Sequence, residues 1–238
     1  MLFHVLGPIE VHVEGARTPI TGKPATVLAT LLLHRAWVSL DELADGVWPD
    51  AAAPPSAVAN LRTYVWQVRR ALPERGRVER RGDAYRLRAE PHEVDADRAA
   101  RTAVEAARTA DPATALSRVD EALGWWRGRA YPGLAAASAV ADQLDELRID
   151  LRELRAAQLL ALDRGAEAVA ELRQVTVASP LREGAWAGLV RALATTGRRT
   201  EALLAYRRAA DLLAAELSVP PGPQLRAARQ SVLSLVAV

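Results

Sequence analysis

The sequence contains no cysteine, and this absence removes several kinds of site at once. Without thiols the chain forms no disulfide, offers no thiolate nucleophile and builds no zinc site with cysteine ligands. It also contains no run of about 18 apolar residues, so it predicts no membrane-spanning helix. Residues 1–30 lack the basic start and the continuous apolar core of a signal peptide, and we therefore expect a cytoplasmic protein.

Lysine is almost absent as well, because Lys23 is the single lysine among 31 basic residues. The excess of arginine over lysine, together with abundant alanine, is typical of a GC-rich genome, so the number of arginines alone is weak evidence for nucleic-acid binding. The distribution of charge is more informative. Residues 91–238 hold 19 basic and 19 acidic residues, so the net charge of +2 arises entirely in the N-terminal part.

Groups that could carry catalysis are sparse. The four histidines, His4, His12, His34 and His92, are scattered along the chain, and His4 and His12 fall in strand-like runs where a packing or rim position is the common case. No nucleophile–base arrangement and no cluster with metal-ligand spacing is present. The sequence therefore predicts no enzyme, no catalytic residue, no metal and no cofactor.

The most informative stretch lies between residues 54 and 88. Apolar residues recur there at steps of three and four, which predicts one buried side of an α-helix over 56–72. Ser56 is a suitable N-cap, and Pro73 prevents the helix from continuing. The predicted buried side consists of Val58, Leu61, Val65, Val68 and Leu72.

The opposite side of this helix is polar and cationic. After it, Arg77–Arg81 and Tyr85–Arg88 predict two short strands closed by a turn at Gly82-Asp83. Residues 60–88 contain nine arginines and three acidic residues. An isolated basic helix is explained as well by a solvated surface as by a nucleic-acid site. The polar side carries Asn60, Thr63, Gln67 and Arg70, flanked by Arg62, Trp66 and Arg69, and Trp66 could either line the core or pack on a sugar backbone.

The residues before this stretch supply the rest of a small mixed domain. Alternating runs predict strands over 2–6, 9–13 and 17–20, and Thr21–Pro24 opens a helix. Ser39 and Glu42 have the spacing of a capping box before a helix over 40–47. Three helices followed by a hairpin predict a winged helix-turn-helix, in which one helix fits the major groove of DNA.

Residues 91–238 predict an all-α part with a repeat. Small and aromatic residues follow the spacing of a tetratricopeptide unit, and the pattern recurs 34 residues upstream. A generic helical bundle is the alternative. The expected helices cover 95–110, 112–127, 138–163, 166–178, 182–196, 200–216 and 222–236, and the repeat positions are Trp186, Leu189, Gly197, Ala202, Tyr206 and Ala209, preceded by Ala168, Leu172 and Val175.

Trp125 and Trp126 form a conspicuous pair in this part of the chain. They could stack on a ligand. We favour the alternative that one ring is buried and the other covers the end of a helix, because paired aromatics most often serve packing.

Seven motifs together resemble one family of transcriptional activators. They are VLGPIEV (5–11), TGKPATVLATLLLHRA (21–36), VSLDELADGVWPD (38–50), NLRTYVWQVRRAL (60–72), YRL (85–87), ALGWWRG (122–128) and ELSVPPGPQLR (216–226). The sequence resembles the actinobacterial antibiotic regulatory protein (SARP) family. Ala84 departs from the pattern, because such proteins commonly carry glycine before the tyrosine of the wing.

The resemblance implies a mainly α protein with a small β part. Residues 1–90 would form an OmpR-type winged helix-turn-helix that binds DNA, and residues 91–238 a TPR-like bacterial transcriptional activation domain. The family binds direct repeats that overlap the −35 region of promoters of secondary-metabolite gene clusters and recruits RNA polymerase. No receiver or ATPase pattern occurs in these residues, so we expect no phospho-switch through an aspartate receiver here.

The resemblance also assigns residues and partners. Helix 56–72 is the recognition helix, 77–88 is the wing, and the loop 49–55 approaches the sigma factor and the alpha subunit of RNA polymerase. The expected partner is double-stranded promoter DNA bound by a homodimer. An alternative function is a TPR-type interaction scaffold whose winged helix does not bind DNA. The predicted DNA-binding residues are Asn60, Arg62, Thr63, Tyr64, Trp66, Gln67, Arg69, Arg70, Arg77, Arg80, Arg81 and Tyr85, and the predicted polymerase contacts are Pro49, Asp50, Ala51, Ala52, Ala53 and Pro54.

Overall fold

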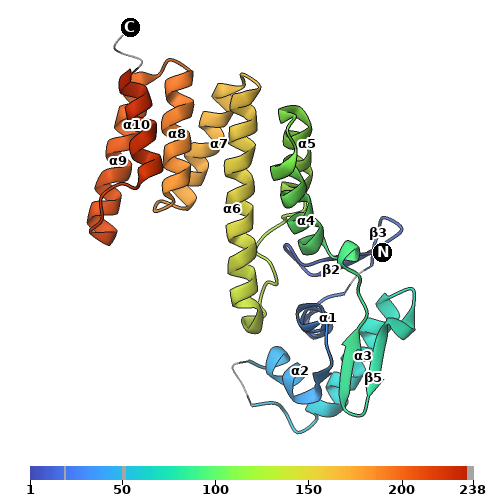
Figure 1. Cartoon of the computed structure of the whole chain (residues 1–238). Coiled ribbons are helices and arrows are strands. Elements are labelled where there is room, and N and C mark those ends of the chain that lie inside the picture. The colour runs from blue at the N-terminus through green and yellow to red at the C-terminus, as the bar shows by residue number, and fades with distance from the viewer. Residues whose placement is uncertain (19, 50–51, 235–238) are drawn as a thin grey trace. The chain divides into compact units, whose positions relative to one another are not determined.

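A computed structural model of the chain describes residues 1–18, 20–49 and 52–234 (Figure 1). Its contacts form two compact units. The first consists of residues 1–101 and 124–146, and the second of residues 102–123 and 147–238. The chain therefore enters the second unit, returns to the first and leaves it again, so the units are not two successive halves of the sequence.

The first unit begins with a three-stranded antiparallel sheet. Strands β1 (Leu2–His4), β2 (Glu10–Val13) and β3 (Ala16–Thr18) follow one another in the order of the sequence. Phe3 pairs with Val11, and both side chains are buried. The three predicted strands are present, and Pro19 of the third lies outside the described residues.

Three helices follow this sheet. They are α1 (Lys23–His34), α2 (Leu40–Val47) and α3 (Ala57–Ala71), and α1 lies against both of the others. The predicted capping box is formed, because Glu42 N donates to Ser39 Oγ at 3.2 Å and Ser39 N donates to Glu42 Oε2 at 2.7 Å. The backbone N–H groups of Ser39 and Glu42 would otherwise remain without acceptors at the start of α2.

A second sheet completes the winged helix. Strand β4 (Val38–Ser39) pairs with β6 (Ala84–Leu87), which pairs with β5 (Val78–Arg81) after the short 3₁₀ helix η1 (Arg75–Arg77). Arg81 faces Ala84, so the turn consists of Gly82 and Asp83, as the sequence predicts. Gly82 has a φ of 60°, a conformation that glycine adopts without strain.

Two details of α3 differ from the prediction. Val58 is 46 % exposed, because Ala57 takes the buried position in the first turn of the helix. Ser56 occupies the N-cap position but accepts no backbone hydrogen bond with its side chain. Its Oγ instead accepts a hydrogen bond from Asn60 Nδ2 at 3.1 Å.

The segment 124–146 packs within the first unit, although the sequence places it far from β1. Arg127 N donates to Leu6 O at 2.7 Å, and Tyr131 N donates to Val5 O at 2.8 Å. A Cβ atom at Gly7 would lie 2.9 Å from Cβ of Arg127, so this close approach requires glycine. The segment continues through the 3₁₀ helix η3 (Ala135–Ala137) into α6 (Ser138–Ala161).

The chain reaches this segment through α4 and α5. A 3₁₀ helix, η2 (Pro91–Glu93), leads into α4 (Asp95–Arg108), and Val94 forms a parallel bridge with Phe3 of β1. Helix α5 (Pro112–Leu123) then belongs to the second unit. The contacts of the first unit thus extend past residue 90, and the division into functional domains at that residue stays a prediction.

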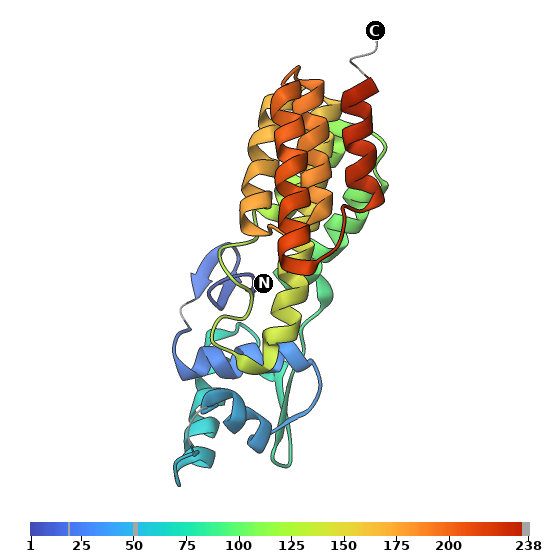
Figure 2. The same cartoon turned by 90° about the vertical axis from the view of Figure 1, so that its left-hand side faces the viewer.

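The second unit is entirely helical among the described residues. It contains α5, parts of α4 and α6, and then α7 (Gly165–Ala178), α8 (Glu183–Thr195), α9 (Arg199–Leu217) and α10 (Pro223–Ser234). Helices α8, α9 and α10 run side by side (Figure 1, Figure 2). Residues 235 and 236 of the last predicted helix lie outside the described residues.

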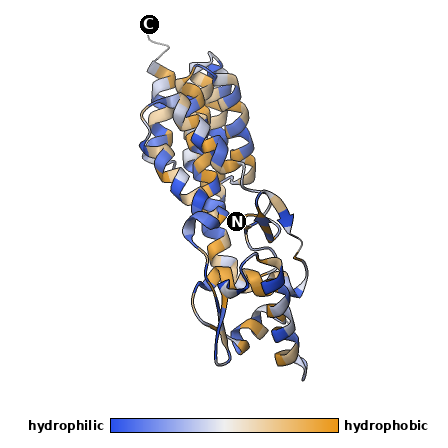
Figure 3. Ribbon diagram, turned by 90° about the vertical axis from the view of Figure 1, so that its right-hand side faces the viewer, coloured by the Kyte–Doolittle hydropathy of each residue, from blue (hydrophilic) through white to orange (hydrophobic). Residues whose placement is uncertain are grey.

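Most repeat positions belong to the core of this unit, whereas Gly197 is exposed and Tyr206 is half-buried. Ala168, Leu172 and Val175 of α7 are buried, as are their counterparts Ala202 and Ala209 of α9. Trp186 Nε1 donates to Pro180 O at 2.8 Å and so fixes the ring between the helices. Hydrophobic and hydrophilic residues alternate along these helices (Figure 3), as expected for helices that bury one side. The predicted fold class is confirmed: a winged helix-turn-helix and a TPR-like helical part in a mainly α chain.

Candidate nucleic-acid interface

One side of α3 faces away from the core of the first unit. Leu61, Val65 and Val68 are buried and pack toward α1, which fixes the rotation of the helix. The opposite side is then available to solvent, as the periodicity predicts. The exposed residues of the predicted set on this helix are Arg62, Thr63, Trp66, Gln67 and Arg70, and Asn60, Tyr64 and Arg69 are half-buried.

Tyr64 takes part in an aromatic cluster beside this surface. Its ring centroid lies 6.4 Å from that of Trp48, which follows α2. Lys23 Nζ, at the start of α1, lies 4.6 Å from the centroid of the Trp48 ring. The cluster joins α1, the end of α2 and α3 where the loop after residue 48 begins. Tyr64 therefore has a packing role in addition to any contact with a ligand.

Arg69 and Tyr85 hold α3 against the hairpin. Arg69 Nη2 donates to Val78 O at 2.7 Å, and its guanidinium lies 5.9 Å from the Tyr85 ring. Tyr85 is only 3 % exposed, on the buried side of β6 together with Leu87. The alternation of Tyr85, Arg86 and Leu87 along the strand is the signal that could have placed the ring inside.

Arg77 is also committed to a protein partner. Its Nη1 donates to Glu93 Oε2 at 2.6 Å, and Glu74 lies 3.6 Å from Nη2. Burial raises the pKa of Glu93, but the hydrogen bonds from Arg77 and from Glu90 N outweigh it and hold the pKa below its ordinary value. Arg77 therefore fixes the start of β5 against η2.

Most arginines of the hairpin are paired in the same way. Arg86 and Arg88 each reach Glu79 at 2.6 Å, and the hydrogen bond from Arg86 lowers the pKa of Glu79. Arg80 Nε donates to Gly82 O at 2.8 Å. Arg62 Nη2 lies 3.3 Å from Asp83 Oδ1, which links α3 to the tip of the wing.

Three arginines of this region remain without an oxygen acceptor among the described residues: Arg70, Arg75 and Arg81. The Arg70 guanidinium lies over the Trp66 ring. Arg75 and Arg81 line an open hollow of about 770 Å³ together with Trp37 and Gly76. Arg75 is one of the nine arginines between residues 60 and 88, but the predicted set of DNA-binding residues did not include it.

The predicted polymerase loop is described only in part. Asp50 and Ala51 lie outside the described residues, Ala52 and Ala53 are exposed, and Pro54 is half-buried. Pro49 lines a hollow of about 310 Å³ with residues 129–135, Ser138 and Ala141 of the first unit.

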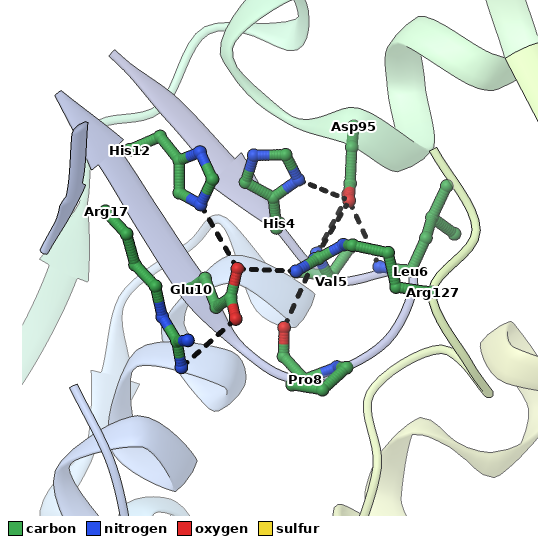
Figure 4. A network of polar contacts seen from close by, with 9 residues as sticks. All are labelled: His4, Val5, Leu6, Pro8, Glu10, His12, Arg17, Asp95 and Arg127. Atoms are coloured by element: carbon green, nitrogen blue, oxygen red, sulfur yellow. Dashed lines mark hydrogen bonds and ion pairs between the residues drawn. The ribbon is translucent and has the colours of Figure 1, made fainter. Parts of the chain in front are cut away.

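A buried carboxylate lies at the end of β1 in this unit (Figure 4). Asp95 is fully buried, and its oxygens accept hydrogen bonds from Val5 N at 2.8 Å and Leu6 N at 3.3 Å. His4 Nδ1 lies 3.3 Å from Oδ2 of the same carboxylate, although not in hydrogen-bonding geometry. Arg127 Nη2 lies 3.8 Å from it. The start of α4 and the segment 124–146 therefore meet at the end of β1.

Arg127 joins this carboxylate to Glu10 of β2. Its Nη1 donates to Glu10 Oε2 at 2.6 Å, and Glu10 also contacts His12 at 3.1 Å and Arg17 at 3.2 Å (Figure 4). Burial raises the pKa of Glu10, but the His12 hydrogen bond and the two guanidinium charges lower it below its ordinary value. The rings of His4 and His12 lie 4.2 Å apart, so both strand histidines pack against each other beside this network.

One of the two adjacent tryptophans is buried, as we favoured. Trp126 is 7 % exposed and belongs to the core. Trp125 is half-buried, and the Arg98 guanidinium lies 5.0 Å from the centroid of its ring.

Tyr131 of the same segment is also buried. Burial raises the pKa of Tyr131 to about 12, although the positive charge of Arg35 acts to lower it.

Two kinds of site are absent from the described residues. No group of three or more histidine, aspartate or glutamate side chains in the described part of the chain is arranged to hold a metal ion. Within the same ranges, no helix has the length and apolar character needed to cross a membrane.

Comparison with known proteins gives a consistent result. The profile described as "Bacterial transcriptional activator domain" matches residues 94–233. Regulatory protein AfsR of Streptomyces griseus is 36 % identical over 240 residues, which cover 97 % of this chain and 24 % of that protein. Regulatory protein DnrI of Streptomyces peucetius is 31 % identical over 252 residues, which cover 98 % of this chain and 92 % of that protein.

A solved structure shares the fold over nearly the whole chain. The structure of Mycobacterium tuberculosis EmbR in complex with a low affinity phosphopeptide matches with a TM-score of 0.87 and 28 % identity. The match covers 98 % of this chain and 65 % of that one. This chain thus spans about a quarter of AfsR, two thirds of the EmbR chain and most of DnrI.

Proposed function

Because this chain belongs to the actinobacterial antibiotic regulatory protein family of transcriptional regulators, we propose that it activates a promoter by binding its DNA sequence specifically. Residues 1–90 would contain the DNA-binding winged helix, and residues 91–238 would act as the transcriptional activation domain. The target would be a secondary-metabolite gene cluster, as the relatives' class suggests. The protein would work in the cytoplasm and would not be an enzyme.

The exposed side of α3 is the observation that carries this proposal. A helix fits the major groove, where glutamine pairs with adenine and arginine pairs with guanine. Gln67 and Arg70 both lie on that side, and Thr63 lies between them and the start of the helix. These three residues, with Asn60 at the margin, are our candidates for base contacts.

The hairpin supports a second kind of contact. Arg75 and Arg81 are exposed, line one hollow and have no carboxylate partner among the described residues. We assign them to the phosphate backbone, because free guanidinium groups beside a recognition helix fix its register on the duplex. Arg62 and Arg80 join them at the rim, whereas Arg69, Arg77 and Tyr85 act as the support that holds the helix and the wing together.

The proposed partners follow the family. Two copies would bind direct repeats near the −35 region as a homodimer on DNA. The loop 49–54 would contact the sigma factor and the alpha subunit of RNA polymerase. A polymerase contact at this loop is consistent with its exposure at Ala52 and Ala53.

The second candidate function is a protein-interaction scaffold. A hollow of about 390 Å³ between α7, α8 and α9 favours it, because the exposed Val177 and Leu204 line it together with Trp186. The relatives are named regulatory proteins, so we place this surface within an activator and do not make it the main function.

A salt series on the full chain tests the main proposal. We expect binding to a promoter fragment to weaken as salt rises, with a log–log slope of about −0.9 for each phosphate contacted. Replacing Arg75 and Arg81 together by alanine should reduce the magnitude of that slope by about 2, since two contacts are lost. Arg191→Ala changes an exposed arginine of α8 and is the matched control. Binding that does not depend on salt would contradict the proposal.

A further inference from the structure

Trp66 and Arg70 form a stacked pair on the exposed side of α3. They are four residues apart, so they share one face of the helix. The Cζ atom of Arg70 lies 4.9 Å from the centroid of the Trp66 ring, within the range of a cation–π contact. Trp66 is 52 % exposed, so it does not belong to the core that Leu61 and Val65 form.

Arg70 points directly away from that core. It follows Leu61 by nine residues, and at 100° per residue these positions differ by about 180° around the helix axis. A side chain at that position reaches furthest into a groove in which the helix lies. Arg70 therefore lies on the side of α3 that would face the bases, in the last turn of the helix.

The hydrogen-bonding state of Arg70 differs from that of its neighbours on the same unit. Arg69 donates to Val78 O, and Arg77 donates to Glu93, so their guanidinium donors are partly used. Arg70 has no such acceptor among the described residues, and its contact with Trp66 is with the ring. Stacking limits where the guanidinium lies while leaving its N–H donors available.

We propose that Trp66 is a positioning residue that holds the Arg70 guanidinium for a bidentate contact with O6 and N7 of one guanine. The inference rests on the proposed DNA-binding function and names the pair that reads one position of the site. The physical reason is the entropy of the arginine side chain. A guanidinium that is already confined by the ring loses less freedom when it meets the base.

The experiment uses the full chain and a duplex selected by it from a random library. Each guanine of that duplex is replaced in turn by 7-deazaguanine, which lacks the N7 acceptor but keeps the shape of the base. We expect the wild-type protein to lose about tenfold in affinity at the guanine read by Arg70, the effect of one hydrogen bond to a charged donor. Arg70→Ala should bind both duplexes equally, since it lacks any donor to N7. Arg70→Lys keeps a donor but lacks the fork that recognises O6 and N7 together, so its penalty should be smaller than that of the wild type.

Variants of Trp66 test whether it positions Arg70 for the contact with guanine. Trp66→Leu should reduce the 7-deazaguanine penalty by about two- to fivefold at the same guanine, because the cation–π contact is lost. Trp66→Phe and Trp66→Tyr keep a ring face and should restore most of the penalty. Trp125→Leu is the matched control, because Trp125 is stacked in the same way by Arg98 at 5.0 Å outside α3, and it should keep the full penalty.

Two outcomes with the protein variants would overturn the inference. One is a Trp66→Leu variant that keeps the wild-type penalty, and the other is an Arg70→Ala variant that still discriminates 7-deazaguanine. Replacing the same guanines by inosine, which keeps O6 and N7, should leave wild-type affinity almost unchanged, and a loss equal to that of 7-deazaguanine would also count against a major-groove contact. Failure to bind any duplex would instead contradict the proposed function itself.

Discussion

The two units of this protein are stabilised in different ways. The first brings together segments that are far apart in the sequence, because Asp95 and residues 127–131 bind the end of β1. The second packs helices against one another around an apolar core between α7, α8, α9 and α10. The first unit thus adds buried polar contacts over long sequence distances to its apolar core, whereas the second depends mainly on apolar contacts between helices.

Buried and exposed carboxylates differ in a similar way. Exposed or half-buried ion pairs occur in both units, such as Arg155 Nε and Asp120 Oδ1 at 2.7 Å in the second and Arg129 Nη2 and Asp142 Oδ1 at 2.8 Å in the first. In the first unit the carboxylate of Asp95 is fully buried and binds backbone N–H groups. Exposed pairs contribute little to stability, but the loss of a buried acceptor leaves its donors without partners. The following three changes exploit this difference.

The largest effect should come from Asp95→Ala. The substitution leaves Val5 N and Leu6 N buried without an acceptor, at about 1–3 kcal/mol for each group, so we expect a loss of about 2–6 kcal/mol in the free energy of unfolding. Urea unfolding of the full chain, followed by probes in each unit, measures it. Asp211→Ala, at an exposed aspartate of α9, is the control and should change stability by less than about 0.5 kcal/mol. Equal effects of the two substitutions would show that the buried carboxylate is not a stabilising contact.

A somewhat smaller loss is expected from Leu172→Ala in α7. Leu172 is 2 % exposed and packs against Gly188 of α8, so its removal leaves a cavity and costs about 2–5 kcal/mol. Calorimetry should show a lower midpoint temperature for the thermal unfolding of the second unit. Val177→Ala on the same helix removes a side chain that is 77 % exposed, and the midpoint should then stay within about one degree of the wild-type value. If the first unit lost as much stability as the second, the two would unfold together.

The smallest effect should be a change in how the melting temperature declines at acidic pH. The pKa of Glu10 is lower in the folded protein than its ordinary value, so Glu10 binds protons more weakly when folded. Its stabilising contribution is therefore present above the ordinary pKa of a glutamate and is lost as pH falls through the lowered folded pKa. Glu10→Gln should flatten the decline of the melting temperature between about pH 5 and pH 3.

The comparison with an exposed carboxylate sharpens this test. The pKa of Glu167 in α7 is also lowered, by the hydrogen bond from Arg164, but the group is exposed and screened by solvent. We expect Glu167→Gln to leave the decline of the melting temperature at acidic pH almost unchanged. If Glu10→Gln and Glu167→Gln changed that decline equally, the distinction between the two carboxylates would be lost.

Local patterns predicted much of this fold. The expected helix over 95–110 ends at Arg108, the one over 200–216 covers Arg199–Leu217, and the capping box at Ser39 is formed with the predicted partner. Such features depend on residues within a few positions of one another, so periodicity and capping chemistry are sufficient to locate them. The exposed position of Val58 was missed because Ala57 takes the buried position in the first turn of α3, and alanine gave a weaker apolar signal than valine.

The candidate interface was predictable only as a surface. The sequence identified the cationic side of the helix and the arginines of the hairpin, but it treated those arginines as equivalent. The structure separates Arg69 and Arg77, which bind Val78 O and Glu93, from Arg70 and Arg81, which bind no oxygen of the described residues. No pattern of spacing could make that separation, because each acceptor belongs to a different element.

The sequence by itself determined the elements, their order and the position of the charge, since each of these is written in the spacing of apolar, capping and basic residues. The tertiary structure alone decided that residues 124–146 complete the first unit and which guanidinium groups keep their donors available. The physical reason is that hydrogen bonds and ion pairs form between atoms that are close in space. The distance along the chain, as between Asp95 and Val5, does not indicate that closeness.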